Sequence, residues 1–231
     1  MRSIFITGTD TGVGKTFVCA LLLKFLRQEG IAAGYQKWVC TGDEAMSADL
    51  QYCLKHAGIA INPAEVELQV PYRFRFPASP HLAASLENQT IDPESIVAKY
   101  NELGHYYDIL VVEGVGGLLV PLRTDLLLAD LLAGLRPQTL VVARSGLGTI
   151  NHSLLTLEAL RSRKIPVLGV VFSDSSPNEE ELIVQDNMRT ISKLGKVRVL
   201  GRLKWCDDPE EAQAAFASIG QAVLDCLPLG T

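Results

Sequence analysis

The chain has 231 residues, a formal net charge of −5, and a composition that is 48% hydrophobic and 20% charged. These proportions are typical of a globular rather than a disordered protein, and the length allows one to two domains at about 150 residues per domain. The acidic balance argues against a general nucleic-acid-binding protein, which would usually present a basic face.

Short β-type runs alternate with longer amphipathic runs along the chain. The predicted strands are mostly continuous apolar runs, as expected for strands covered on both faces, and occupy residues 3–7, 33–38, 109–113, 139–143, 167–172 and 197–201. The predicted helices carry apolar residues at helical spacing and occupy residues 15–29, 48–56, 149–163, 179–194 and 208–227. This alternation predicts an α/β fold with a mostly parallel, doubly wound sheet, in a single domain spanning residues 1–231.

Residues 62–89 are the least regular part of the sequence, with prolines and aromatic residues gathered at positions 71–77. They predict a long connection. In a compact domain such a connection is often functional, and a surface loop with packed aromatic side chains is the alternative.

The segment GTDTGVGKT at positions 8–16 follows a predicted buried strand and opens a predicted helix. Its glycines let several backbone N–H groups point at one anion, and the helix N-terminus adds its positive end. Counted from Gly8, the spacing is one residue longer than in the usual G-x-x-x-x-G-K-[ST] loop. The segment predicts a P-loop NTPase fold, with nucleotide contacts from Gly12, Val13, Gly14, Lys15, Thr16 and Phe17.

Three further residues are candidates for the same site. Glu113 ends an apolar strand, which is where a P-loop enzyme holds Mg²⁺ or its bound water. Lys37 ends the second predicted strand and would face the same crevice as Lys15, because ligands bind outside the carboxyl ends of parallel strands. An exposed structural lysine is the alternative for Lys37, and a capping or surface role is the alternative for Asp49.

The chain shows no targeting segment, because its apolar residues begin at Ile4 and continue into the glycine-rich turn without a basic stretch or cleavage site before them. It has no apolar run of about 18 residues that would span a membrane. None of its five cysteines forms a C-x-x-C pair, and no histidine lies at zinc-finger spacing. We therefore expect free thiols, a reducing compartment and a cytoplasmic protein that binds neither membrane nor nucleic acid.

Taken together, the motifs resemble those of dethiobiotin synthetases. In chain order they are GTDTGVGKT at 8–16, AGY at 33–35 with Lys37 and TG at 41–42, PY at 71–72 with SPH at 79–81, VEG at 112–114 with GG at 116–117, and GTINH at 148–152. The combination of the loop, the Glu-Gly-x-Gly-Gly run and Ile-Asn-His is specific to that family.

The resemblance implies an ATP- and Mg²⁺-dependent cyclo-ligase that joins CO₂ to 7,8-diaminopelargonate and closes a ureido ring, through a carbamate and a carbamic–phosphoric anhydride. It implies that Lys15, Lys37 and Thr11 are catalytic and that Thr16, Asp49 and Glu113 hold Mg²⁺. By the same resemblance, Thr11, Lys37 and Thr41 bind the carbamate and the diamine end.

The resemblance also implies a homodimer with its active sites at the interface. The substrate's tail carboxylate would then bind at a helix N-terminus of the other subunit, formed by Gly148, Thr149, Ile150 and Asn151. Ser173 and Asp174 stand where the family has an Asn-Asp pair at the adenine. Because a serine lacks the planar amide that offers both a donor and an acceptor, we expect weaker selectivity for adenine.

Two other functions share this loop. A cobyrinate-type amide synthetase carries a glutaminase domain, for which too few residues follow position 201, so an ammonia-dependent form is the one left open. A non-catalytic nucleotide switch of the partitioning type carries a second lysine near position 10, where this chain has Asp10. A need for a small amine and bicarbonate, rather than for a protein or DNA partner, would separate the cyclo-ligase from the switch.

Overall fold

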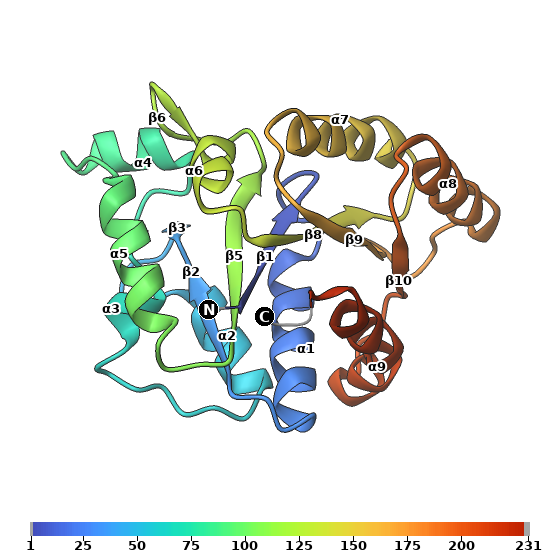
Figure 1. Cartoon of the computed structure of the whole chain (residues 1–231), viewed down its shortest axis with the longest axis horizontal. Coiled ribbons are helices and arrows are strands. Elements are labelled where there is room, and N and C mark those ends of the chain that lie inside the picture. The colour runs from blue at the N-terminus through green and yellow to red at the C-terminus, as the bar shows by residue number, and fades with distance from the viewer. Residues whose placement is uncertain (1, 229–231) are drawn as a thin grey trace.

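A computed structural model of the protein describes residues 2–228 and contains a six-stranded sheet with helices on both sides (Figure 1). The strands of this sheet are β1 (Arg2–Gly8), β2 (Ala33–Lys37), β5 (Ile109–Gly117), β8 (Gln138–Arg144), β9 (Val167–Ser173) and β10 (Val199–Leu203). Their order is β10-β9-β8-β1-β5-β2, and every neighbouring pair is parallel. The predicted doubly wound α/β fold is confirmed.

Two hydrophobic cores lie on the two faces of this sheet. Helices α1 (Lys15–Gln28), α2 (Ala48–His56) and α9 (Pro209–Cys226) cover one face, and α5 (Pro93–Leu103), α6 (Leu128–Leu135), α7 (Thr149–Ser162) and α8 (Glu181–Leu194) cover the other. In β1, Ile4 and Ile6 enter the first core while Phe5 enters the second. Because both faces are buried, the strands are continuous apolar runs in the sequence.

The predicted strand 33–38 is interrupted at Trp38, so this prediction was wrong at its end. β2 stops at Lys37, and β3 (Val39–Thr41) pairs with β4 (Tyr72–Phe74) in a separate two-stranded parallel sheet. The buried Trp38 ring lies 4.9 Å from that of Phe5 and its indole donates to Gln36 Oε1 at 2.9 Å. The polar residues Gln36 and Lys37 precede the break and the apolar residues Val39 and Cys40 follow it, but nothing in this pattern shows that the chain leaves the sheet.

Residues 62–89 are more regular than predicted, and four helices of the structure were missed, two in this segment and two after it. The segment contains α3 (Val66–Gln69), β4 and α4 (Pro80–Leu86), whereas α5 and α6 lie in stretches with no assigned element. A hairpin of β6 (Pro121–Arg123) and β7 (Leu126–Leu127) was also missed. Asp92 accepts hydrogen bonds from the first turn of α5, with Pro93 following it, and Asp208 and Pro209 begin α9 in the same way.

The structure also bears on the state of the cysteines and on membrane-spanning helices. All five cysteines are free, as predicted. Within residues 2–228, no helix combines the length and the apolar character needed to cross a membrane.

Candidate functional site

The turn between β1 and α1 is built to surround an anion. Gly12 and Gly14 have φ angles of 71° and 95°, a backbone region that glycine adopts without strain. Gly14 also lies so close to Ser173 that a Cβ there would come within 2.8 Å of the Ser173 Oγ. Gly14 is the N-cap of α1 and provides no side-chain cap, so the first backbone N–H groups of this helix are available to a phosphate.

Lys15 lies at the centre of this loop. Its Nζ donates to the backbone oxygen of Asp10 at 2.9 Å, and the residue is only 6% exposed. Burial, followed by the nearby charge of Lys37, lowers the pKa of Lys15 to about 8. An anion placed between the two lysines would therefore favour the charged form of Lys15.

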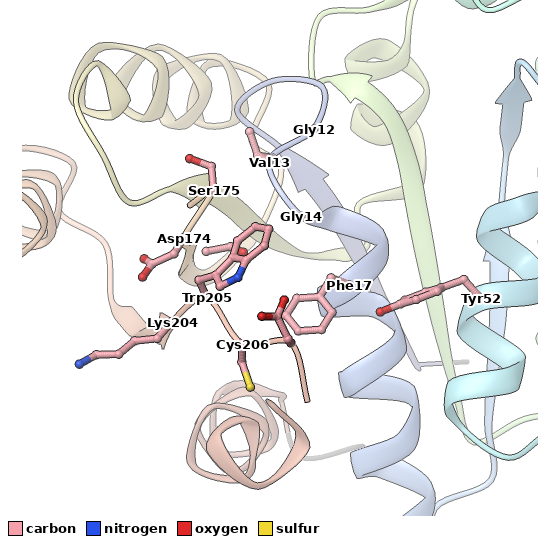
Figure 2. Close-up of a pocket in the computed structure, with 12 residues that line it drawn as sticks. Gly12, Val13, Gly14, Phe17, Tyr52, Asp174, Ser175, Lys204, Trp205 and Cys206 are labelled. Carbon is pink, nitrogen blue, oxygen red and sulfur yellow. The ribbon is translucent and has the colours of Figure 1, made fainter. Parts of the chain in front are cut away.

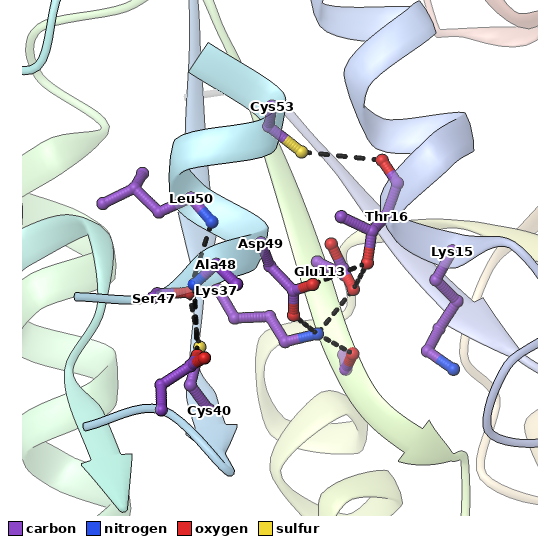
Figure 3. A network of polar contacts seen from close by, with 12 residues as sticks. Lys15, Thr16, Lys37, Cys40, Ser47, Ala48, Asp49, Leu50, Cys53 and Glu113 are labelled. Carbon is purple, nitrogen blue, oxygen red and sulfur yellow. Dashed lines mark hydrogen bonds and ion pairs between the residues drawn. The ribbon is translucent and has the colours of Figure 1, made fainter. Parts of the chain in front are cut away.

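A second cluster joins Thr16, Lys37, Asp49 and Glu113 (Figure 3). The Thr16 Oγ1 lies 2.8 Å from Glu113 Oε1 and 3.1 Å from Asp49 Oδ1. The Lys37 Nζ lies 2.5 Å from Glu113 Oε1 and 2.9 Å from Asp49 Oδ2. Parallel pairing places Lys37 on β2 beside Glu113 on β5, and the first turn of α2 supplies Asp49.

Electrostatics keep the Lys37 side chain charged. Burial alone would lower its pKa, but the carboxylates of Glu113 and Asp49 outweigh that effect and raise the pKa of Lys37 well above its usual value. The ammonium group therefore lies between the buried carboxylate of Glu113, which is 1% exposed, and the partly exposed carboxylate of Asp49.

The oxygen atoms of this cluster fit Mg²⁺. They come from one hydroxyl and two carboxylates, the hard donors that Mg²⁺ prefers, and Mg²⁺ usually takes its other ligands from water and phosphate. The Lys37 ammonium already stands as a cation between the two carboxylates. Within residues 2–228, no group of three or more His, Cys, Asp or Glu side chains is placed to bind a metal, and this cluster itself has two carboxylates.

Two clefts meet at the phosphate loop. The first has a volume of about 420 Å³, and its walls include the predicted catalytic, metal and diamine-binding residues Thr11, Lys15, Thr16, Lys37, Thr41, Asp49 and Glu113. The second has a volume of about 470 Å³, and its walls include Val13, Tyr52, Ser173, Asp174 and residues 204–207 (Figure 2). Gly12, Gly14 and Phe17 line both clefts. A phosphate chain on the loop would thus connect a reactant in the first cleft with a nucleoside in the second.

In the second cleft, the predicted nucleotide contact Asp174 is already engaged by another side chain. Asp174 lines it, but the Asp174 carboxylate is bound by the Arg202 guanidinium through contacts of 2.8 and 2.9 Å. Trp205 is 47% exposed, and Figure 2 shows its ring in the cleft next to Gly14, whereas Lys204 points away. Trp205 was not among the predicted nucleotide contacts, although the signal available was an isolated tryptophan in a polar segment at the end of the last strand. The contact of Arg202 with Asp174 was not predicted either.

Residues 148–151 lie outside both clefts of the chain. Gly148 is the N-cap of α7, with a φ of 89° and no side-chain cap. The Thr149 Oγ1 is directed into the helix, 3.3 Å from the Ser153 Oγ. Backbone N–H groups are therefore what this helix start offers to a ligand.

Known proteins resemble the chain along most of its length. A family model described as an AAA domain matches residues 2–213. The ATP-dependent dethiobiotin synthetase BioD of Methanocaldococcus jannaschii is 38% identical over 211 residues, which is 90% of this chain and 96% of the relative. The protein of the same name from Rhizorhabdus wittichii is 44% identical over 219 residues, which is 94% of this chain and 95% of the relative.

Solved structures share the fold at low sequence identity. The MinC:MinD cell division protein complex of Aquifex aeolicus matches with a TM-score of 0.64 at 14% identity, over 100% of this chain and 99% of that one. The septum site-determining protein MinD of Pyrococcus horikoshii, complexed with Mg-ADP, matches with a TM-score of 0.55 at 17% identity, over 96% and 95%. These likenesses support the P-loop NTPase fold alone.

Proposed function

Because this chain belongs to the family of ATP-dependent dethiobiotin synthetases, we propose that it converts 7,8-diaminopelargonate, CO₂ and ATP into dethiobiotin, ADP and phosphate, with Mg²⁺. The enzyme is an ATP-dependent cyclo-ligase. The observation that carries the proposed reaction is the first cleft. In that cleft two lysines, three threonines and two carboxylates surround a space of about 420 Å³ directly beside the phosphate loop.

The chemistry proceeds in three steps. One substrate amine adds to CO₂ and loses a proton, which gives a carbamate. A carbamate oxygen then attacks the γ-phosphorus of ATP, the bond from that phosphorus to the bridging oxygen breaks, and ADP leaves. The second amine attacks the carbonyl carbon of the resulting anhydride, loses a proton and expels phosphate as the ureido ring closes. The phosphoryl transfer needs chiefly positioning and charge stabilisation.

The lysines of the cleft fit that requirement. Lys15 rises from the loop and would contact the terminal phosphates, and Lys37 would approach the carbamate and the moving phosphoryl group from the other side. Lys37 remains protonated because its carboxylate neighbours raise its pKa. The hydroxyls of Thr11 and Thr41 would hydrogen-bond the carbamate and the second amine.

The carboxylates and Thr16 have a separate task. Bound to Thr16, Asp49 and Glu113, Mg²⁺ would neutralise charge on the β- and γ-phosphates. Asp49 and Glu113 also hold the Lys37 ammonium in place by contacts of 2.9 and 2.5 Å. The same two residues would thereby keep the catalytic lysine and the nucleotide in a fixed relation.

We further propose that the chain acts as one domain in a homodimer in the cytoplasm. Residues 148–151 lie outside both clefts but present an uncapped helix start, and Leu147 beside them is 84% exposed. A helix start of this kind binds carboxylates through its N–H groups and its positive end. It would serve the substrate of a second copy. The five free cysteines fit a reducing compartment.

The test of the reaction is ADP release with Mg-ATP, 7,8-diaminopelargonate and bicarbonate, with each omitted in turn. We expect release to require all of them and dethiobiotin to be found by mass spectrometry. ADP release that needs ammonia would favour an amide synthetase, and release that needs a protein or DNA partner would favour a switch. Repeating the assay with GTP and CTP tests the expected weak selectivity that follows from Ser173.

A further inference from the structure

Glu113 uses its two carboxylate oxygens on opposite sides. Oε1 faces the first cleft, where it lies 2.8 Å from the Thr16 Oγ1 and 2.5 Å from the Lys37 Nζ. Oε2 faces the protein interior, where the Tyr35 hydroxyl donates to it at 2.7 Å. Both Glu113 and Tyr35 are buried, with exposures of 1% and 0%. The orientation of the Glu113 carboxylate is therefore fixed by Tyr35 in the protein interior as well as by Thr16 and Lys37 at the cleft.

The strand geometry explains why Tyr35 can reach this atom. Tyr35 and Lys37 are two residues apart on β2 and so project from the same face of the sheet. β2 is paired in parallel with β5, with Tyr35 opposite Val111 and Lys37 opposite Glu113. Lys37 thus reaches the carboxylate from the position directly opposite Glu113. Tyr35 reaches it from two residues earlier on β2, further from the carboxyl edge of the sheet.

We propose that Tyr35 is a positioning residue for the magnesium site: its hydroxyl holds Oε2 of Glu113 inward, so that Oε1 is presented to Thr16 and to the metal. This inference rests on the proposed function, because it concerns the same Mg²⁺. Tyr35 lines neither cleft and reaches the metal only through Glu113.

Loss of the hydroxyl has a defined physical consequence. A buried carboxylate oxygen without a donor is strongly unfavourable, so the carboxylate must rotate towards another donor. Rotation moves Oε1 away from Thr16 and from the proposed metal position. Changes to the residues that orient a metal ligand typically weaken metal affinity by about 10- to 100-fold.

The test is Tyr35→Phe, which keeps the ring and removes the hydroxyl. Its matched control is Tyr100→Phe, because Tyr100 is also buried and its hydroxyl lies 2.5 Å from the Ser3 Oγ, away from the cleft. Calorimetry would measure the Mg²⁺ concentration that gives half of the metal-dependent binding of a non-hydrolysable ATP analogue, and the affinity for the analogue in EDTA. We expect Y35F to raise the Mg²⁺ requirement about 10- to 100-fold without changing the EDTA value, and Y100F to match the wild type.

Three outcomes separate the claims. If Y35F keeps the wild-type Mg²⁺ requirement, the role of Tyr35 is overturned while the proposed reaction stands. If the wild type itself binds the analogue equally well in Mg²⁺ and in EDTA, the magnesium site of the proposed function fails. If both affinities change equally in Y35F, Tyr35 has only a structural role.

A double-mutant cycle with Glu113→Ala covers the case in which Y35F unfolds. Because E113A has no carboxylate for Tyr35 to bind, Y35F would lower the melting temperature of E113A less than that of the wild type, and would add nothing to the Mg²⁺ defect of E113A. A Y35F effect of equal size in both backgrounds, or a further Mg²⁺ defect in the double variant, contradicts the inference.

Discussion

Replacing Lys37 by methionine removes a cation that two carboxylates share. Lys37 is 5% exposed and contacts Glu113 and Asp49 at 2.5 and 2.9 Å. Removing one partner of a buried ion pair costs about 3–5 kcal/mol, and we expect the lower end because Glu113 keeps the hydroxyls of Thr16 and Tyr35. At about 2–4 °C per kcal/mol for a chain of this size, the melting temperature should fall by about 6–12 °C.

The loss in K37M should be specific to the missing charge. Because the lysine stands between the carboxylates proposed to hold Mg²⁺, millimolar Mg²⁺ should recover part of the stability of K37M and change the wild type less. The control is Lys24→Met, which breaks an exposed pair with Glu210 and should cost less than about 1 kcal/mol. The measurement is thermal unfolding at neutral pH with EDTA or Mg²⁺. A K37M variant that melts like the wild type in EDTA, or that gains nothing from Mg²⁺, would refute the reasoning.

The remaining predictions concern the binding of the phosphates, the binding of the nucleotide base and the sharing of sites in a homodimer. Nucleotide affinity in EDTA should fall as pH rises from 7 to 9, because the pKa of Lys15 is about 8 and its charge is lost above that pH; titration calorimetry should show a flat profile for Lys15→Met. Trp205→Ala should weaken ADP and GDP binding by a similar factor of at least about fivefold, since base stacking contributes about 1–3 kcal/mol, and a loss for one base alone would contradict a stacking role. Thr149→Pro removes a backbone N–H at the first position of α7, where a proline is tolerated, and should raise KM for the diamine about tenfold while leaving KM for ATP unchanged. At a low diamine concentration, mixing K37M with T149P should restore activity only if sites are shared between subunits.

The sheet and the phosphate loop could be predicted because their signals are local. A strand buried on both faces is a continuous apolar run, and the loop glycines directly precede Lys15 and an amphipathic helix. The separate strand β3 could not be predicted, because the three apolar residues at positions 38–40 that follow Lys37 give no sign that the chain leaves the sheet. α6 could not be predicted either, because its eight residues are too few and too uniformly apolar to show a polar face.

The site residues at the ends of strands could be predicted from the sequence, but the contacts that involve residues inside strands could not. Glu113 and Lys37 terminate apolar runs, so their positions alone direct them to the carboxyl edge of the sheet. The Tyr35 hydroxyl was missed because a tyrosine inside an apolar strand is indistinguishable from any core aromatic residue. The pairing of Asp174 with Arg202 was missed because it joins residues 28 positions apart, which only the pairing of β9 and β10 brings together.

The central claim is that the γ-phosphoryl group passes to a carbamate oxygen in the first cleft, and isotope transfer tests it most directly. The enzyme would be given 7,8-diaminopelargonate, Mg-ATP and CO₂ labelled with ¹⁸O, and the released phosphate would be analysed by mass spectrometry within one turnover. Attack by the carbamate oxygen predicts one ¹⁸O atom in the phosphate and one labelled oxygen in dethiobiotin. Unlabelled phosphate beside labelled dethiobiotin would show that the phosphoryl group goes to water instead, and would contradict the mechanism.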